Sequence, residues 1–213
     1  SKDGLKLTPQ GKNLLPDALN SLKSLDRIKG KRPLVKFKIG CHASVGLFIL
    51  GDFLKIMHKE NSEIDFEVVT GSSHDINKMT AKGEVDFGIV MNPISLQGLI
   101  TKTIGEDEVA IWESKDRYQD KLIYNPQMLQ ATSIISRWKA APEQAIDVTN
   151  LELAAVLAAS GAGFGILPTQ VVKVLDLKLK KVPNTPTFKD HLALVCYPDM
   201  LKSPEGKMIF ESL

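Results

Sequence analysis

Cys41, His42 and Ser44 bring a thiol, an imidazole and a hydroxyl into one short stretch of the chain. These side chains serve in nucleophilic catalysis, but a catalytic triad usually gathers its members from separate segments and uses an acid to orient the base. No acidic residue lies close by in the sequence, so a hydrolase is the least favoured interpretation. His42 stays open between ligand contact and a local hydrogen bond, and Cys41 is expected to be a small buried residue.

Small hydroxyl and amide side chains recur where predicted strands end. They include Ser72, Asn92, Asn125 and Thr149. In an open parallel sheet, ligands bind at the carboxyl ends of the strands, where loops lead into helix N-termini. Backbone N–H groups and hydroxyl donors at such positions suit a small anion, such as a carboxylate.

Helix capping is the alternative explanation for the same hydroxyl groups. Ser72 precedes Asp75, and Thr149 precedes Glu152, with the spacing of a capping box. Ser44 could cap its own helix in a similar way. Capping explains these residues at least as well as ligand contact does, so both explanations stay open.

The other histidines show no metal-ligand spacing. His58, His74 and His191 lie far from one another and from both cysteines, Cys41 and Cys196. A lone distant cysteine pair is a weak disulfide signal, so we expect reduced thiols. The sequence has no P-loop and no nucleophile-elbow motif. We therefore expect no catalytic residue, no metal and no cofactor.

The glycines of residues 161–165 (Gly-Ala-Gly-Phe-Gly) follow a predicted helix and enter a predicted strand. A dinucleotide-binding fingerprint has the opposite order, because it follows a strand and opens a helix. The segment therefore predicts a tight turn between a helix and a strand.

The composition is that of an ordinary folded protein: 213 residues, 43% of them apolar and 24% charged. No apolar run approaches the ~18 residues of a membrane span, and the first residues lack the apolar stretch of a signal peptide. We therefore expect a cytoplasmic protein without membrane contact. Residues 1–38 carry a net charge of +7 and the remainder −5, which suggests a basic arm near a polyanion or, alternatively, a solvated helix face.

Thr8 and Pro9 predict the start of a long first helix. An apolar seam with 3-4-3 spacing runs along it, formed by Leu15, Ala18, Leu22 and Leu25. Gly30 ends the helix, and a hinge follows through Pro33. A long helix with one apolar stripe has no local surface to pack on, so we expect it to pair with another chain.

Strand and helix patterns alternate in the rest of the chain. The predicted strands cover residues 35–40, 64–70, 85–90, 108–113, 122–124, 146–148, 163–167, 177–182 and 192–197. The predicted helices cover residues 45–58, 72–82, 127–138, 151–159, 169–175 and 203–210. This alternation predicts an α/β fold with a parallel sheet and crossover helices.

Several segments together resemble the LysR-type transcriptional regulators. They are residues 7–11 (Leu-Thr-Pro-Gln-Gly) with 14–16 (Leu-Leu-Pro), 39–45 (Ile-Gly-Cys-His-Ala-Ser-Val), 68–73 (Val-Val-Thr-Gly-Ser-Ser), 83–90 (Gly-Glu-Val-Asp-Phe-Gly-Ile-Val) and 156–168 (Val-Leu-Ala-Ala-Ser-Gly-Ala-Gly-Phe-Gly-Ile-Leu-Pro). Each motif is weak alone, but five motifs in the right order across nearly the whole chain are specific.

The resemblance implies an α/β fold of two Rossmann-like subdomains with type II periplasmic-binding-protein architecture, joined by crossing strands and preceded by a linker helix. Residues 1–7 would be a remnant of the DNA-binding wing, and residues 8–33 the dimerisation helix and hinge. Effector subdomain I would cover residues 34–108 with 190–213, and subdomain II residues 109–189. The effector cleft would be lined by Cys41, His42, Ala43, Ser44, Ser72, Asn92, Asn125, Thr149 and Asn150.

The resemblance also implies a function and partners. The chain would be the ligand-sensing and oligomerisation module of a DNA-binding regulator, with a small metabolite in its cleft, and the loop residues described above favour an anionic one. Its partners would be the effector, further copies of itself and, through a winged helix-turn-helix that this sequence mostly lacks, DNA. A solute-binding protein of a transporter is the alternative, although it has no use for the leucine-seamed helix.

One region departs from the family pattern. Residues 113–122 form a much shorter stretch than family members have between the crossing strand and the second subdomain. We expect a helix to be missing there, which puts the second half of the pocket in question.

Overall fold

The computed structural model of the chain describes residues 8, 11, 14, 35–61 and 63–213. The chain forms two units, Ser1–Lys36 and Phe37–Leu213. In the first unit, the Gly11 N–H donates to the Thr8 hydroxyl at 3.0 Å, and Gly11 and Leu14 are helical. This contact confirms that Thr8 caps a helix start. The seam residues Leu15, Ala18, Leu22 and Leu25, and the hinge, lie outside the described residues.

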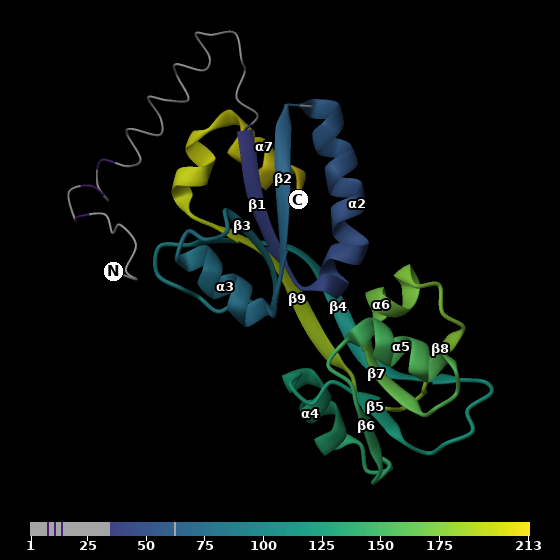
Figure 1. Ribbon diagram of the computed structural model, residues 1–213. Helices are drawn as coiled ribbons and strands as arrows, with labels where there is room; N and C mark the ends of the chain where they lie inside the picture. Colours follow the sequence, from purple (N-terminus) through teal and green to yellow (C-terminus); the bar gives the residue numbers. More distant parts are fainter. Residues whose placement is uncertain (1–7, 9–10, 12–13, 15–34, 62) are drawn as a thin grey trace, which may run out of the picture. The chain divides into compact units, whose positions relative to one another are not determined.

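Helices and strands alternate along the second unit, largely as predicted (Figure 1). The strands are β1 (Val35–Cys41), β2 (Ile64–Thr70), β3 (Phe87–Met91), β4 (Ile100–Ser114), β5 (Leu122–Tyr124), β6 (Ala145–Asp147), β7 (Phe164–Pro168), β8 (Leu179–Lys181) and β9 (Phe188–Cys196). The helices are α2 (Ala43–Glu60), α3 (Ser73–Ala81), α4 (Leu129–Arg137), α5 (Leu151–Ala159), α6 (Thr169–Val174), a short 3-10 helix (Pro198–Lys202) and α7 (Pro204–Ser212).

The strands form one mixed sheet, in the order β2-β1-β3-β9-β4-β7-β5-β6, with β8 paired to β4. Strand β1 is parallel to β3, and β5 is parallel to both β6 and β7. Strand β9 runs antiparallel to β3 and β4, and β4 runs antiparallel to β7 and β8. The predicted parallel pairing therefore holds toward the two edges of the sheet, whereas its centre is antiparallel.

We call β1, α2, β2, α3, β3 and α7 the first lobe, and β5, α4, β6, α5, β7, α6 and β8 the second lobe. Strands β4 and β9 run side by side from one lobe to the other (Figure 1). Strand β9 pairs with β3 over Leu192–Cys196, and β4 pairs with β7 over Val109–Trp112. Residues 105–108 and 188–191 lie between these two pairings, and we call them the crossing segment.

Both crossing strands are longer than the sequence predicts. Strand β4 has 15 residues and β9 has nine, whereas the sequence patterns indicated only residues 108–113 and 192–197. The additional residues pair with one another from Ile100↔Cys196 to Val109↔Phe188, with a bulge between Thr103 and Gly105. Pairing between these distant segments keeps polar residues of β4 and β9 in extended conformation, and the local hydrophobic pattern does not indicate a strand there.

Each lobe has its own apolar core. Ile39, Phe87 and Ile89 are fully buried in the first lobe. Ile123 and Leu167 belong to a cluster of the second lobe. Since each lobe packs around a core of its own, the surfaces that face each other across the crossing segment can hold polar groups.

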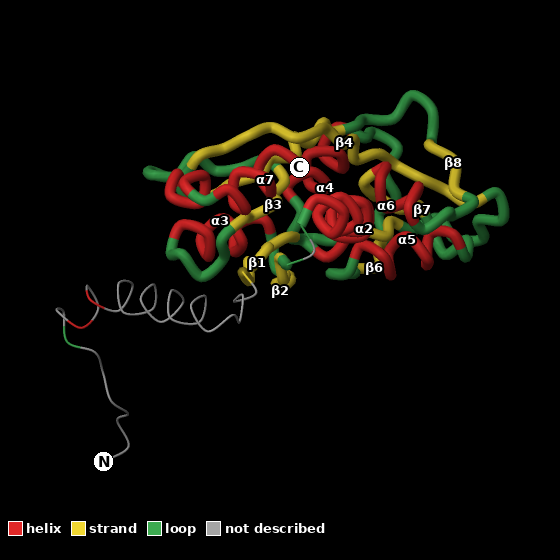
Figure 2. The backbone as a smooth tube through the Cα atoms, turned by 90° about the horizontal axis from the view of Figure 1, so that it is seen from above, coloured by secondary structure: helices red, strands yellow, loops and turns green. Residues whose placement is uncertain are grey.

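Helix α2 lies beside β2 in the first lobe (Figures 1 and 2). It buries Val45, Phe53 and Met57, whereas Leu47 and Leu54 are exposed. The same helix also contacts α6 of the second lobe. The two lobes therefore touch along α2 and α6 in addition to sharing the crossing strands.

The glycine-rich segment forms the predicted turn between α5 and β7. Gly161 has φ +89° and Gly163 has φ +156°, both in a region that side chains disfavour. A Cβ atom at Gly163 would clash with the backbone carbonyl of Lys121. Glycine is therefore required here by backbone geometry and not by a phosphate ligand.

The short stretch between β4 and β5 contains a turn and no helix in the described chain. Arg117 lies over the ring of Phe164 at 3.9 Å and contacts the carboxylates of Glu113 at 3.2 Å and Asp120 at 2.9 Å. Trp138 packs edge-on against the same Phe164 ring. These contacts pack the short stretch against Phe164 of β7 in the second lobe.

Among the described residues, none of the helices combines the length and the apolar character that crossing a bilayer requires.

Candidate functional site

A cavity of about 870 Å³ lies against the crossing segment, with walls from both lobes. Six of the nine residues expected around a cleft line it: His42, Ser44, Ser72, Asn92, Asn125 and Thr149. Cys41 is fully buried behind this surface, and Ala43 and Asn150 are exposed but outside the lining. The volume falls within the range of small-molecule sites.

His42, and not Ser44, caps the first helix of the cavity wall. The ring nitrogen Nδ1 of His42 accepts the backbone N–H of Ser44 at 3.3 Å and lies 2.7 Å from the Ser44 hydroxyl. The prediction of a Ser44 cap is wrong because the helix starts at Ala43, which places Ser44 inside the first turn. Since Nδ1 accepts the N–H, the neutral ring carries its proton on Nε2.

The environment of His42 favours the neutral ring. Burial lowers the pKa of the imidazole below its usual value, and the negative charge of Glu152 partly offsets this effect. Ser44 is only 4% exposed, and neither carboxylate oxygen of Glu152 has a hydrogen-bond partner within the described chain. The three residues therefore do not form an accessible nucleophile with an oriented base.

Ser72 caps the next helix of the first lobe, as the capping-box spacing predicts. Its hydroxyl accepts the N–H of Asp75 at 3.1 Å and donates to the Asp75 carboxylate at 2.6 Å. The neighbouring Ser73 hydroxyl accepts the N–H of Met91 at 3.0 Å. The Ser73 bond ties the start of α3 to the end of β3 at the cavity wall.

The second predicted capping box is wrong. Asn150 caps α5 by accepting the Leu153 N–H at 2.6 Å, because the chain becomes helical one residue later than a Thr149 cap requires. Asn125 is 8% exposed and joins two loops, since it donates to the Thr149 carbonyl at 3.1 Å and accepts the Gln127 N–H at 2.9 Å. Thr149 thus lines the cavity without serving as a helix cap.

Asn92 is bound to the end of β9. Its backbone is left-handed, with φ +50°, and its amide oxygen accepts the His191 N–H at 3.0 Å. Its amide nitrogen donates to Asp190 at 2.7 Å, and Gln130 of α4 donates to the same carboxylate at 3.0 Å. Asp190 therefore connects an amide of each lobe.

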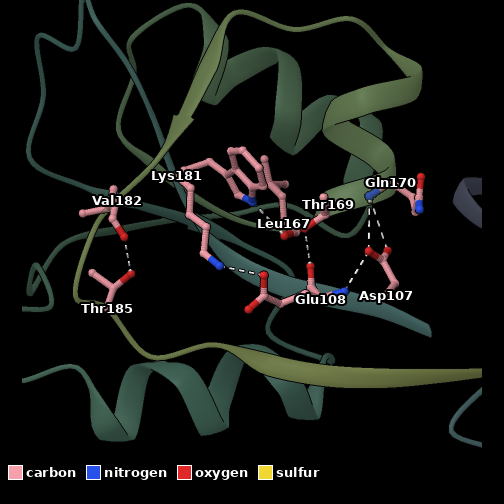
Figure 3. Close-up of polar contacts among 9 residues, drawn as sticks. Asp107, Glu108, Leu167, Thr169, Gln170, Lys181, Val182 and Thr185 are labelled. Atoms are coloured by element: carbon pink, nitrogen blue, oxygen red, sulfur yellow. Dashed lines mark hydrogen bonds and ion pairs between the residues drawn. The ribbon is translucent and has the colours of Figure 1, made fainter.

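Asp107 is the second carboxylate of the crossing segment that faces the cavity. It accepts the N–H of Glu108 at 2.8 Å and the N–H of Gln170, at the start of α6, at 3.3 Å (Figure 3). Burial raises the pKa of Asp107, and the charge of Asp190 adds to this increase against the two backbone hydrogen bonds and Lys173. Burial also raises the pKa of Asp190, against hydrogen bonds from Gln130 and Asn92 and the charge of His191.

Sequence reasoning missed Asp107, Asp190 and Gln130. A signal for Asp190 existed, because the alternation of Leu192 and Leu194 extends backward to residues 190 and 188 with a period of two. Nothing local marks Gln130, which meets Asp190 from 60 positions away.

The charge of the cavity differs from the expected surroundings of an anion. No Lys or Arg lines it within the part of the chain that the structure describes, whereas Asp75, Asp107 and Asp190 do.

Cys41 and Cys196 are free and buried, as expected. Burial raises the pKa of the Cys41 thiol, with a smaller opposing effect from the Gly46 backbone, and raises that of Cys196 to about 11.

Comparison with protein families gives a match over most of the chain. The sequence model of the LysR substrate binding domain matches residues 32–211. No curated protein matches the chain.

Solved structures share the fold at low sequence identity. A variant of the regulatory domain of OxyR2 from Vibrio vulnificus is 16% identical, with a TM-score of 0.68 over 84% of this chain and 94% of that one. The regulatory domain of HypT from Salmonella typhimurium is 16% identical, with a TM-score of 0.69 over 84% and 93%. A full-length variant of OxyR from Pseudomonas aeruginosa is 17% identical, with a TM-score of 0.66 over 100% and 82%.

Proposed function

Because the chain belongs to the LysR substrate binding domain family, the effector-binding domains of LysR-type transcriptional regulators, we propose that it senses a small metabolite in the cavity beside the crossing segment. Six cavity residues that the sequence indicates come from the five segments that directly follow β1, β2, β3, β5 and β6. The observation that carries the proposal is this shared cavity, because a ligand there contacts both lobes at once.

A ligand between two lobes can act as a conformational signal. Binding favours whichever arrangement of the lobes makes more contacts with the ligand, and it shifts the population toward that arrangement. The polar bridge from Asn92 through Asp190 to Gln130 joins the lobes at the wall of the cavity. We propose that effector binding changes the lobe arrangement about this point.

We also propose a contact between an anionic group of the ligand and the hydroxyl-bearing loops. Ser73 and Thr149 place neutral hydroxyl donors on the lining, together with the Nε2–H of His42. A carboxylate can accept hydrogen bonds from such groups without a permanent positive charge nearby. The cavity residues act as binding residues in this account, and we propose no catalytic role for any of them.

Self-association and DNA binding complete the proposed regulator. We propose that residues 8–33 form a helix that pairs through Leu15, Ala18, Leu22 and Leu25, and that DNA is bound by a winged helix-turn-helix outside this sequence. We place the protein in the cytoplasm and divide residues 34–213 into subdomains 34–108 with 190–213, and 109–189. These assignments rest on the sequence pattern and on the family.

A solute-binding protein of a transporter is the second candidate, since its fold includes a similar cavity between lobes. The basic, leucine-seamed helix that the sequence predicts for residues 8–33 favours the regulator, because a monomeric receptor gains nothing from a pairing helix.

The test is thermal unfolding of the whole chain with a panel of small metabolites. A binding compound stabilises the folded state and raises the midpoint. In Thr149→Val, the affinity should fall by about 0.5–1.5 kcal/mol for the lost hydrogen bond. Thr132→Val is the matched control, because Thr132 is exposed on α4 and lies outside the cavity lining. Equal affinities in the two variants would show that the ligand binds elsewhere.

A further inference from the structure

On one face of the crossing segment, each carboxylate has a positively charged partner or a histidine. Glu106 lies opposite His191, with a carboxylate oxygen 3.4 Å from the ring nitrogen Nδ1 of His191, and another carboxylate oxygen lies 3.9 Å from the Lys189 ammonium. Glu108 contacts the Lys181 ammonium at 2.6 Å (Figure 3). Pairs of opposite charge across neighbouring strands stabilise a sheet.

The other face, which lines the cavity, carries two like charges instead. Asp107 and Asp190 are direct partners in the register of β4 and β9, so their side chains leave the sheet on the same face. They are 9% and 2% exposed. Like charges directly opposite one another destabilise a sheet, so this pair is unfavourable without a positive group between the lobes.

Within the described part of the chain, only neutral groups donate hydrogen bonds to the two carboxylates. Asp190 accepts the amides of Asn92 and Gln130, and Asp107 accepts the backbone N–H groups of Glu108 and Gln170. An ionised carboxylate offers about four acceptor positions. Each Asp therefore retains capacity for a further donor from the cavity.

The nearby positive charges do not neutralise the pair. The charges of Lys173 and His191 act on Asp107 and Asp190 respectively, but neither residue lines the cavity. The pKa of His42 is lowered, so this lining imidazole is neutral at pH 7.

Glu152, whose charge acts on the cavity residue His42, carries a carboxylate without a hydrogen-bond partner among the described residues. Both oxygens of Glu152 are buried. Buried carboxylates without partners are costly and call for an explanation such as an absent ligand. Glu152 thus adds a negative charge beside His42 that lacks a donor, although Glu152 itself does not line the cavity.

We propose that the effector carries a protonated nitrogen, which binds between Asp107 and Asp190. This inference rests on the proposed effector-binding function and specifies the ligand class: a primary amine, or an amino acid whose carboxylate faces the hydroxyl-bearing loops. An ammonium group brings three donors and one charge, which match the spare acceptor positions of the two aspartates. A metal ion fits less well, because no group of three metal-ligating side chains converges among the described residues.

The test uses three five-carbon probes that differ only in their end groups: 1,5-diaminopentane, 5-aminopentanoate and glutarate. Thermal unfolding of the full chain reports binding of each. The diamine or the amino acid should raise the midpoint, whereas glutarate should not. Asp107→Asn and Asp190→Asn preserve size and should each weaken binding of the amine probe roughly tenfold or more. Glu106→Gln, on the opposite face, is the control and should bind like the wild type.

A second readout separates ligand binding from a merely structural role. Without ligand at pH 7, Asp107→Asn should be at least as stable as the wild type, because it removes the repulsion and keeps an acceptor for Gln170. A large loss of stability, or amine binding that persists in both Asn variants, would overturn the proposal.

The other outcomes of the probe series also test whether the ligand carries an amine. A shift with glutarate alone would overturn the amine and leave the effector-binding function standing. A shift with calcium or magnesium chloride, and none with the amines, would overturn it as well. If no probe shifts the midpoint, the amine proposal fails in this form, while the metabolite panel tests the effector-binding function separately.

Discussion

Gln130→Ala removes the contribution of the second lobe to the polar bridge. The Gln130 amide nitrogen lies 3.0 Å from one oxygen of Asp190 and 3.2 Å from the other. A hydrogen bond to a charged group contributes about 1.5–3 kcal/mol to stability. We therefore expect the free energy of unfolding to fall by about this amount at pH 7, which lowers the midpoint by roughly 3–12 °C for a domain of this size.

The pH dependence of this loss has a definite sign. The Gln130 hydrogen bond lowers the pKa of Asp190 against the larger effect of burial, so the folded pKa is higher in Gln130→Ala than in the wild type. The amide stabilises the ionised carboxylate more than the protonated one. The difference in stability between the two proteins should therefore shrink as the pH falls through the folded pKa of Asp190.

Urea unfolding followed by circular dichroism measures this difference. Gln127→Ala is the matched control, because Gln127 is exposed and lines the same cavity without contacting Asp190. Surface substitutions usually change stability by no more than about 0.5 kcal/mol. If the two substitutions change the free energy of unfolding equally within that margin, the hydrogen bond between Gln130 and Asp190 does not stabilise the contact between the lobes.

Three further predictions follow from the packing, the thiols and the sequence. In thermal unfolding, Gly88→Ala should destabilise the first lobe by about 1–3 kcal/mol through overpacking, because the added Cβ would lie 2.6 Å from Thr80 Oγ1 and 2.8 Å from Val195 Cγ2. The control Gly51→Ala has open space around the added Cβ and should stabilise α2 by about 0.5–1 kcal/mol. Equal effects of the two substitutions would contradict this packing. Since the pKa of Cys196 is raised to about 11, the stabilising effect of its protonated thiol should be lost as the pH rises from about 9 through 11. Iodoacetamide should also label Cys196 much faster in urea than in the native protein. Fast labelling of the native protein would refute the burial of this thiol. Leu22→Asp should weaken self-association in light scattering, because it places a charge in the predicted apolar seam; an unchanged assembly would count against helix pairing.

The alternation of strands and helices could be predicted from sequence because each element follows a local period. The βα series from β1 to β3 and the turn at Gly161 and Gly163 are examples. The full lengths of β4 and β9 could not be predicted in the same way. Polar residues such as Lys102 and Asp107 interrupt their apolar alternation, and only pairing between distant segments fixes them as strands.

Part of the candidate site could likewise be predicted from the sequence, and part could not. Loops after the strands identify His42, Ser72, Asn92, Asn125 and Thr149 as cavity residues, because topology alone places those loops together. The capping details depend on where each helix begins to within one residue, and sequence spacing does not resolve this.

The charge of the cavity depends on the crossing segment. Asp107 and Asp190 come together only through the register of two strands more than 80 positions apart. Their meeting is a property of the folded chain, so a reading of the loops alone predicts a cavity poor in acid.

Native mass spectrometry of the intact chain, incubated with a metabolite extract, tests whether a metabolite binds between the lobes. We expect one small molecule to be retained per chain. It should be lost in Thr149→Trp, which fills the cavity, and kept in Thr132→Trp, which does not. No retained molecule, or one retained equally by both variants, would contradict a metabolite site between the lobes.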